Sequence, residues 1–207
     1  MIVYGLSLLG VAVYAVSGAL AAGRKRLDWV GVIVLAVVTS IGGGTLRDLL
    51  LNRQAVFWVE DPTYLWAIMA GAAATLVYVQ FFKPPNNALL YADALGLAFF
   101  TMVGAQVAEG EGVPTLIVVV MAILTGVAGG VLRDVLTREI PVLFRSTETL
   151  YSVAALGGVL LYLGLERLGV PKVSASLWGI VFIVLLRFLA IRFKIRLPAF
   201  HVSDELT

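Results

Sequence analysis

Long apolar runs make up most of this chain, and short polar stretches separate them. A membrane-spanning helix needs roughly 20 mostly apolar residues, and seven runs approach or exceed that length. They cover about residues 2–22, 29–50, 62–82, 88–108, 113–136, 149–166 and 173–191. The pattern predicts an all-α integral membrane protein with seven transmembrane helices and excludes an ordinary soluble fold.

Composition supports this class and narrows the chemistry. The 207 residues are 60% hydrophobic and 14% charged, whereas soluble domains carry roughly 25% charged residues. No linker divides the chain, so residues 1–207 are expected to form a single transmembrane domain. Cysteine is absent, which excludes disulfides and thiolate metal sites. Phosphate-loop, zinc, nucleophile-elbow and dinucleotide motifs are also lacking, so we expect no enzyme activity, cofactor, metal or nucleic-acid partner.

The basic residues predict an orientation, because cytoplasmic connections are enriched in Lys and Arg. If the C-terminus is cytoplasmic and the N-terminus outside, nine basic residues near span ends lie inside and three lie outside. The inner set is Arg24, Lys25, Arg26, Lys83, Arg138, Arg145, Arg192, Lys194 and Arg196, and the outer set is Arg53, Arg167 and Lys172. Four tryptophans near span ends are expected to form interfacial belts, namely Trp29, Trp58, Trp66 and Trp178. The single histidine, His201, is expected to be solvated.

The chain contains an internal repeat. The residues 43–48 read Gly-Gly-Thr-Leu-Arg-Asp, and 86 residues later 129–134 read Gly-Gly-Val-Leu-Arg-Asp. The predicted boundaries are about 1–83 for repeat one, 88–168 for repeat two and 173–192 for the seventh helix. Each repeat has an odd number of spans, so the second enters the membrane from the opposite side. Such inverted repeats commonly place a transport site at their interface.

The glycines of the motif allow two interpretations. Gly42, Gly43 and Gly44, like Gly129 and Gly130, either let helices pack closely or let the helix kink or unwind and line a cavity. We favour a kinked, pore-lining helix, because charges adjoin both copies. The nearby hydroxyls are further pore-lining candidates, although such groups often bond to their own helix backbone; they belong to Thr39, Ser40, Thr45 and Thr125.

The two Arg-Asp steps are predicted to lie at opposite membrane faces. Arg47 lies ~28 Å along its span and Arg133 ~30 Å along its own, at a rise of ~1.5 Å per residue. Each arginine either extends to the lipid headgroups or faces the bundle interior. Because adjacent residues point about 100° apart on a helix, Arg47 and Asp48 are not expected to form a simple local pair. Asp93 is the expected partner of Arg133, and its repeat counterpart Ser7 is a weaker candidate partner for Arg47.

This duplicated motif, in the second helix of each three-helix repeat, resembles the prokaryotic trimeric intracellular cation (TRIC) channels. The resemblance covers nearly the whole chain. It implies a homotrimer in a bacterial or archaeal plasma (inner) membrane, with a potassium-permeable pore inside each protomer. The second and fifth spans would bend at their glycines and line that pore, making residues 42–48 and 129–134 its candidate lining and gating residues.

Three functional hypotheses remain at this point. The favoured one is a monovalent-cation channel for potassium, with sodium as a second candidate ion. The alternative is a secondary transporter for glycine or another small amino acid, in which helix N-termini at Thr45 and Val131 would hold a carboxylate. The third is a structural membrane protein without transport.

Overall fold

Seven long helices form the bundle in the computed structural model, which describes residues 2–145 and 150–195. They are α1 (Ile2–Arg24), α2 (Trp29–Leu50), α4 (Thr63–Phe81), α5 (Ala88–Gly110), α6 (Thr115–Leu136), α7 (Tyr151–Arg167) and α8 (Lys172–Phe193). Each boundary lies within two residues of the predicted span. Six of these helices have the length and hydropathy of membrane spans, and α7, with 17 residues, lies at the short end of the range. The all-α fold of seven spans is confirmed.

Two short elements lie in the connections. The helix α3 (Phe57–Glu60) and the 3-10 turn η1 (Val142–Phe144) follow α2 and α6, respectively. The sequence pattern predicted a polar connection at residues 52–61 and no helix within it, so α3 was not predicted. The apolar pair Phe57-Trp58 was the available signal, because Phe57 is buried against Tyr64 of α4, with ring centroids 4.8 Å apart.

Local backbone signals end the helices at matching positions of the two repeats. The connections after α1 and α5 turn at Arg26 and Gly112, and those after α2 and α6 turn at Asn52 and Arg138, all with positive φ. Both pairs are 86 residues apart. Asp28 caps α2 by accepting a hydrogen bond from the backbone N–H of Gly31, at 2.7 Å.

Contacts between the repeats exchange partners under the same 86-residue shift. A Cβ on Gly10 would meet the ring of Phe100, and a Cβ on Gly96 would meet the ring of Tyr14. Tyr14 and Phe100 are themselves repeat counterparts, and their rings stack with centroids 5.4 Å apart. The pseudo-two-fold axis of the inverted repeat therefore passes between these two rings.

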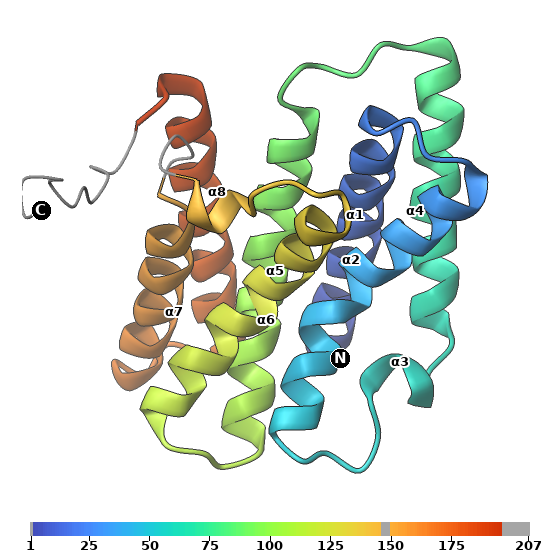
Figure 1. Cartoon of the computed structure of the whole chain (residues 1–207). Helices are drawn as coiled ribbons and strands as arrows, with labels where there is room; N and C mark the ends of the chain where they lie inside the picture. Colours follow the sequence, from blue (N-terminus) through green and yellow to red (C-terminus); the bar gives the residue numbers. More distant parts are fainter. Residues whose placement is uncertain (1, 146–149, 196–207) are drawn as a thin grey trace, which may run out of the picture.

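Helix α5 occupies the centre of the bundle and packs against α1, α6 and α8. The helices α2 and α6 run in opposite directions beside one another, as Figure 1 shows. Both are continuous α-helices through their glycines. Unwinding at Gly42–Gly44 is therefore wrong for this structure, because close packing against neighbouring helices holds the glycine backbone in helical form.

Candidate functional site

The centre of the site is the contact between α2 and α6. Gly43 lies against the backbone carbonyl of Thr125, and Gly129 lies against that of Thr39, so closely that any Cβ at either glycine would overlap the oxygen. These two contacts are repeat counterparts of one another. Glycine is required at both positions because it alone lets the two backbones approach this closely. Close packing, the less favoured of the two interpretations of these glycines, is thus present in the structure.

The other three motif glycines make room for side chains. A Cβ on Gly42 would meet Leu132 at 2.5 Å, and one on Gly44 would meet the ring of Phe57. A Cβ on Gly130 would come within 2.9 Å of Asp93 Oδ1. Gly130 therefore gives a carboxylate access to the face of α6, which connects the glycine motif with its charges.

The candidate hydroxyl groups are satisfied by backbone carbonyls. Thr39 donates to Leu35 O and Thr125 to Met121 O, both at 2.6 Å, and both side chains are fully buried. Ser40 donates to Val11 O on α1 at 2.8 Å. In this conformation Thr39 and Thr125 bond to the backbone of their own helices, and Ser40 joins α2 to α1.

Thr45 has a second role at the end of the site. It donates to Ile41 O and accepts a hydrogen bond of 3.0 Å from the indole Nε1 of Trp58. Trp58, a residue of α3, is partly buried and contacts α2, unlike Trp29, Trp66 and Trp178, which are exposed. The indole N–H of Trp58 thus has a partner within the bundle, and its place in an interfacial belt stays a prediction.

Both arginines of the repeated motif face the bundle interior. The exposed fraction is 2% for Arg47 and 0% for Arg133, so neither extends to the headgroups. Each pairs with the aspartate that follows it, with Nη2–Oδ1 distances of 2.7 Å to Asp48 and 2.8 Å to Asp134. The prediction that Arg47 and Asp48 would not pair was wrong. The long arginine side chain folds around the helix and reaches a carboxylate that is 100° away at the Cβ.

Each aspartate also anchors the connection that follows its helix. Oδ2 of Asp48 accepts from the backbone N–H of Phe57, and Oδ2 of Asp134 accepts from that of Val142, both at 2.9 Å. The two acceptor groups thus hold the first residues of α3 and η1. At each end of the site, the Arg-Asp step therefore connects the buried end of α2 or α6 to the short element that follows it.

The two ends differ in their further partners. The expected contact of Arg133 with Asp93 is present, with Nη1 2.7 Å from Oδ1, and Arg133 also donates to Ser17 at 2.5 Å. Ser7, the counterpart of Asp93, instead donates to Val3 O. Arg47 lies over the ring of Phe57 at 5.7 Å.

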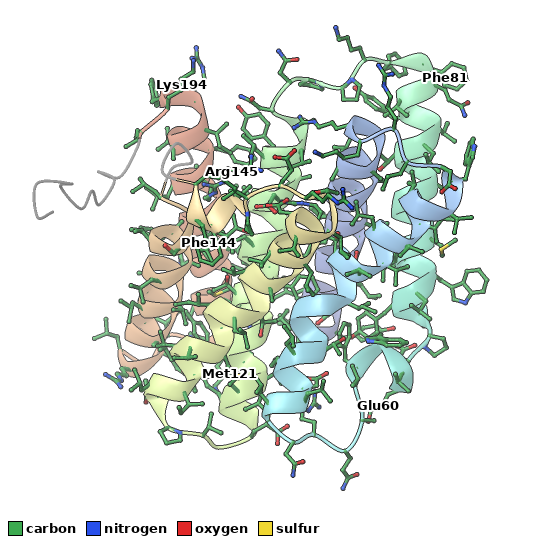
Figure 2. All side chains as sticks on the ribbon, viewed as in Figure 1. Glu60, Phe81, Met121, Phe144, Arg145 and Lys194 are labelled. Carbon is green, nitrogen blue, oxygen red and sulfur yellow. The ribbon has the colours of Figure 1, made fainter. Side chains whose placement is uncertain are left out.

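Two cavities open at the two ends of this charged axis. The Arg47 cavity, of about 360 Å³, is bordered by Ser7, Arg47, Arg53, Glu60, Asp61 and Tyr64 among others. The Asp134 cavity, of about 290 Å³, is bordered by Lys25, Asn86, Asp134, Thr137, Glu139 and Arg145 among others. Figure 2 shows the labelled Glu60 and Arg145 at opposite ends of the bundle. Between the cavities lie the fully buried side chains of Tyr14, Phe100, Thr39 and Thr125.

An ion pair crosses between the repeats at the rim of each cavity. Lys25 binds Glu139 beside the Asp134 cavity, and Arg53 Nε lies 3.0 Å from Glu111 Oε1 at the other end. These pairs are also repeat counterparts, because the 86-residue shift takes Lys25 to Glu111 and Arg53 to Glu139. The hydrogen bond from Lys25 lowers the pKa of Glu139 below its usual value of 4.5.

Sequence reasoning missed one charged residue of the site, Arg187. It lies in α8, is fully buried and places its guanidinium 4.8 Å from the ring centroid of Tyr151. The available signal was a single charge inside an otherwise apolar span, which is rarely tolerated without a role. The prediction counted only the basic residues near the end of that span.

The described segments 2–145 and 150–195 contain no cluster of three or more residues suited to hold a metal ion. The prediction for His201 concerns a residue outside these segments.

Comparison with known proteins identifies the family. The family model described as "Glycine transporter" matches residues 4–80 and 90–167, one segment in each repeat. The UPF0126 inner membrane protein YadS of Escherichia coli K12 is 43% identical over 99% of both chains. A UPF0126 membrane protein of Vibrio cholerae is 41% identical over 98% of this chain and 84% of its own length.

Comparison with solved structures identifies the same family. The TRIC trimeric intracellular cation channel orthologue from Rhodobacter sphaeroides has a TM-score of 0.88 and 36% identity, and the match covers 94% of this chain and 99% of the other. A prokaryotic TRIC channel in 0.5 M KCl has a TM-score of 0.87 and 29% identity, over 95% of this chain and 99% of the other. These relatives are named as channels, in agreement with the expectation that the chain is not an enzyme. The chain belongs to the UPF0126 membrane proteins, the bacterial TRIC family.

Proposed function

We propose that this protein is a potassium-permeable cation channel whose conduction path runs inside each protomer along α2 and α6. The observation that carries the proposal is the pair of polar cavities at opposite ends of the α2–α6 contact, each reaching a buried Arg-Asp step. The solved relatives named as cation channels support the same function.

The charges of this path favour weak cation binding. Each arginine is paired with a carboxylate, so the positive charge that would repel cations is largely balanced. Carboxylate and carbonyl oxygens are ligands that hard cations accept. A path lined in this way passes cations without holding them strongly, which conduction requires.

The described conformation fits a closed state of such a channel. The buried stack of Tyr14 on Phe100 and the close contact of Gly43 and Gly129 with the opposite helix lie between the two cavities. A conducting state requires α2 and α6 to separate or bend at these glycines. The proposed lining and gating residues are Thr39, Ser40, Gly42, Gly43, Gly44, Thr45, Arg47, Asp48, Thr125, Gly129, Gly130, Arg133 and Asp134.

The proposed location is a bacterial or archaeal plasma membrane, with the N-terminus outside and the C-terminus cytoplasmic. The excess of Lys and Arg on the C-terminal side of the spans supports this orientation. With it, the Asp134 cavity opens to the cytoplasm and the Arg47 cavity opens outside. A homotrimer is proposed because a related solved structure is named as a trimeric channel.

Recordings from planar bilayers that contain the purified protein test the proposal. With potassium chloride at unequal concentrations on the two sides, discrete single-channel steps and a cation-selective reversal potential are expected, and sodium chloride in place of potassium chloride on one side then gives the preference between the two cations. Saturable uptake of glycine into vesicles, without such steps, would instead favour the transporter. If the intact oligomer shows neither activity, the hypothesis of a structural membrane protein without transport remains.

The glycines provide a second test of the path. Gly44→Leu and Gly130→Leu are expected to block or reshape conduction, because the new side chains would meet Phe57 and Asp93, respectively. Size-exclusion chromatography checks that the oligomer remains folded. Unchanged conductance in both variants would mean that these glycines serve packing alone.

A further inference from the structure

A cavity of about 560 Å³ lies between α1, α4 and α5, apart from the α2–α6 contact. A second volume of about 430 Å³ shares walls with it at Leu20, Thr75 and Ala88 and continues along α1 and α4. Both volumes fall in the range of roughly 300–1,000 Å³ that ligand pockets occupy. We call the two together the α1–α4 groove, whose largely apolar lining includes Val16, Leu20, Ala74, Leu76, Val79 and Leu89.

The polar groups of the groove lie mainly at one end, beside the connection from α4 to α5. Arg24 of α1 and Lys83 of that connection line this end, and both residues are exposed. Arg24 Nη2 donates to the backbone oxygen of Asn86 at 2.6 Å, which holds the guanidinium beside the connection. The Thr75 hydroxyl on the wall of the groove donates to Gly71 O at 2.8 Å. The groove therefore has an apolar interior and a basic end.

The carboxylates near this basic end are already paired. The groove shares Arg24 with the Asp134 cavity, which is bordered by two carboxylates. Asp134 binds the arginine that precedes it, and Glu139 binds Lys25. Among residues 2–145 and 150–195, neither Arg24 nor Lys83 forms an ion pair with a carboxylate.

The full charge count at this end of the bundle is positive. The groove and the Asp134 cavity are lined by four basic and two acidic residues, namely Arg24, Lys25, Lys83, Arg145, Asp134 and Glu139. Deeper in the bundle, Arg133 and Asp93 add one charge of each sign. Arg26 and Asp28 in the connection from α1 to α2 do the same. The excess is two positive charges even without Arg187, so the field at the groove end favours an anion.

The second repeat has no equivalent of this basic end. The 86-residue shift takes Arg24 to Gly110 and Lys83 to Gly169, neither of which carries a charge. In addition, α8 packs directly against α5 and α7, which are the counterparts of α1 and α4. Repeat one has no additional helix that could cover α1 and α4 in the same way. The groove is therefore a feature of the first repeat alone.

We propose that the α1–α4 groove binds an anionic phospholipid from the membrane leaflet at this end of the bundle. The phosphate lies between Arg24 and Lys83, and the acyl chains lie along the apolar walls of α1 and α4. Basic pockets between transmembrane helices on the cytoplasmic side bind anionic lipid headgroups in this way. Figure 2 shows Phe81, the last residue of α4, at the same end as Arg145 and Lys194. This end faces the cytoplasm in the proposed orientation.

Native mass spectrometry of the purified oligomer tests the site, with phosphatidylglycerol and phosphatidylcholine of identical acyl chains as probes. The wild type should bind one phosphatidylglycerol per protomer more tightly than phosphatidylcholine, which carries no net charge. Arg24→Gln/Lys83→Gln should weaken phosphatidylglycerol binding by about 25-fold, because each basic residue near an anionic lipid contributes about fivefold. Arg192→Gln/Lys194→Gln is the matched control, since it removes two exposed basic residues at the end of α8.

A second pair of variants tests the apolar part of the groove. Ala74 lines the groove, whereas Ala73, its exposed neighbour on α4, does not. Ala74→Trp should weaken the binding of both lipids, because the indole occupies the space of an acyl chain, and Ala73→Trp should weaken neither. Glycerol phosphate, which has the charge but no acyl chains, should not displace bound phosphatidylglycerol.

The charge itself is separated from folding by two further variants. Arg24→Lys/Lys83→Arg keeps both charges and should keep the preference for phosphatidylglycerol. If Arg24→Gln/Lys83→Gln does not fold, Lys83→Gln alone decides, with an expected loss of about fivefold in affinity. Every readout is lipid binding, so the outcome is independent of whether the protein conducts ions.

Three results would overturn the proposal. The first is equal affinity of the wild type for the two lipids, or unchanged phosphatidylglycerol affinity in the variants that remove Arg24 or Lys83. The second is displacement by glycerol phosphate at the concentration of the lipid, which would indicate a site for free anions. The third is loss of the oligomer in Arg24→Gln/Lys83→Gln with lipid binding kept, which would indicate that the groove is a contact between copies of this chain.

Discussion

The central glycines should tolerate no side chain at all, and Gly43→Ala and Gly129→Ala test this directly. The added methyl group would overlap the carbonyl oxygen of Thr125 or of Thr39 by more than about 1 Å, given an ordinary contact of 3.4 Å or more. Both obstacles are backbone atoms of a packed helix, which cannot rotate away. The two helices must therefore move apart in either variant.

The expected magnitude follows from two opposing effects. Overfilling a packed interior costs typically 1–3 kcal/mol, while alanine in place of glycine within a helix gains roughly 0.5–1 kcal/mol. We expect a net loss of about 1–2 kcal/mol for each variant. For a chain of this size that corresponds to a fall of roughly 2–8 °C in the unfolding temperature.

The assay is thermal unfolding in detergent, with Gly5→Ala and Gly164→Ala as controls. Both control glycines lie in helices, and an added Cβ would find nothing within 4 Å. These control variants should therefore unfold at the wild-type temperature or slightly above it, whereas Gly43→Ala and Gly129→Ala should unfold below it. If Gly43→Ala and Gly129→Ala unfold at the same temperature as the controls, the close contact between α2 and α6 is not as described.

Three other predictions follow from the charged residues. Asp93→Asn should destabilise the fold by about 3–5 kcal/mol in chemical unfolding, because it breaks a buried ion pair with Arg133; a loss below about 1 kcal/mol would contradict this. The Glu139 carboxylate should titrate below 4.5 in carbon-13 NMR, because Lys25 lowers its pKa, and Lys25→Met should raise the midpoint. The pKa of Glu139 is lower in the folded state than in the unfolded state. The pair with Lys25 therefore stabilises the fold fully above the unfolded-state pKa, and this stabilisation is lost as the pH falls through the folded-state pKa. Exchanging the charges, as Arg53→Glu/Glu111→Arg, should destabilise the fold by more than about 1 kcal/mol, because Arg53 also pairs with the buried Asp48 and the new carboxylate would oppose it; a smaller loss would mean that Arg53 serves only the exposed pair with Glu111.

Hydrophobic pattern predicted most of the fold, because span length in a membrane follows directly from the thickness of the apolar core. The register of the repeat was also predicted from the sequence, because a six-residue motif recurs after 86 residues with a difference at one position. The short helix α3 was missed because its four residues bury only Phe57, which leaves too weak a pattern to recognise.

Side-chain geometry was the less predictable part of the site. The pairing of Arg133 with Asp93 was predicted from their depth in the membrane, but local Arg-Asp pairing was not. The direction of the Cα–Cβ bond does not determine where an arginine guanidinium lies, because several rotatable bonds separate them. The single charge of Arg187 in an apolar span was visible in the sequence, but its contact with Tyr151 of another helix was not.

The rim ion pairs have a consequence for how the two halves of the chain recognise one another. At both rims the first repeat provides the cation, from Lys25 or Arg53, and the second provides the anion, from Glu139 or Glu111. Two copies of the first repeat arranged around the same axis would bring Lys25 against Arg53 at both membrane faces. Two copies of the second would oppose Glu111 and Glu139. Each half is therefore matched to the other and not to itself, so halves expressed as separate polypeptides should assemble as a mixed pair.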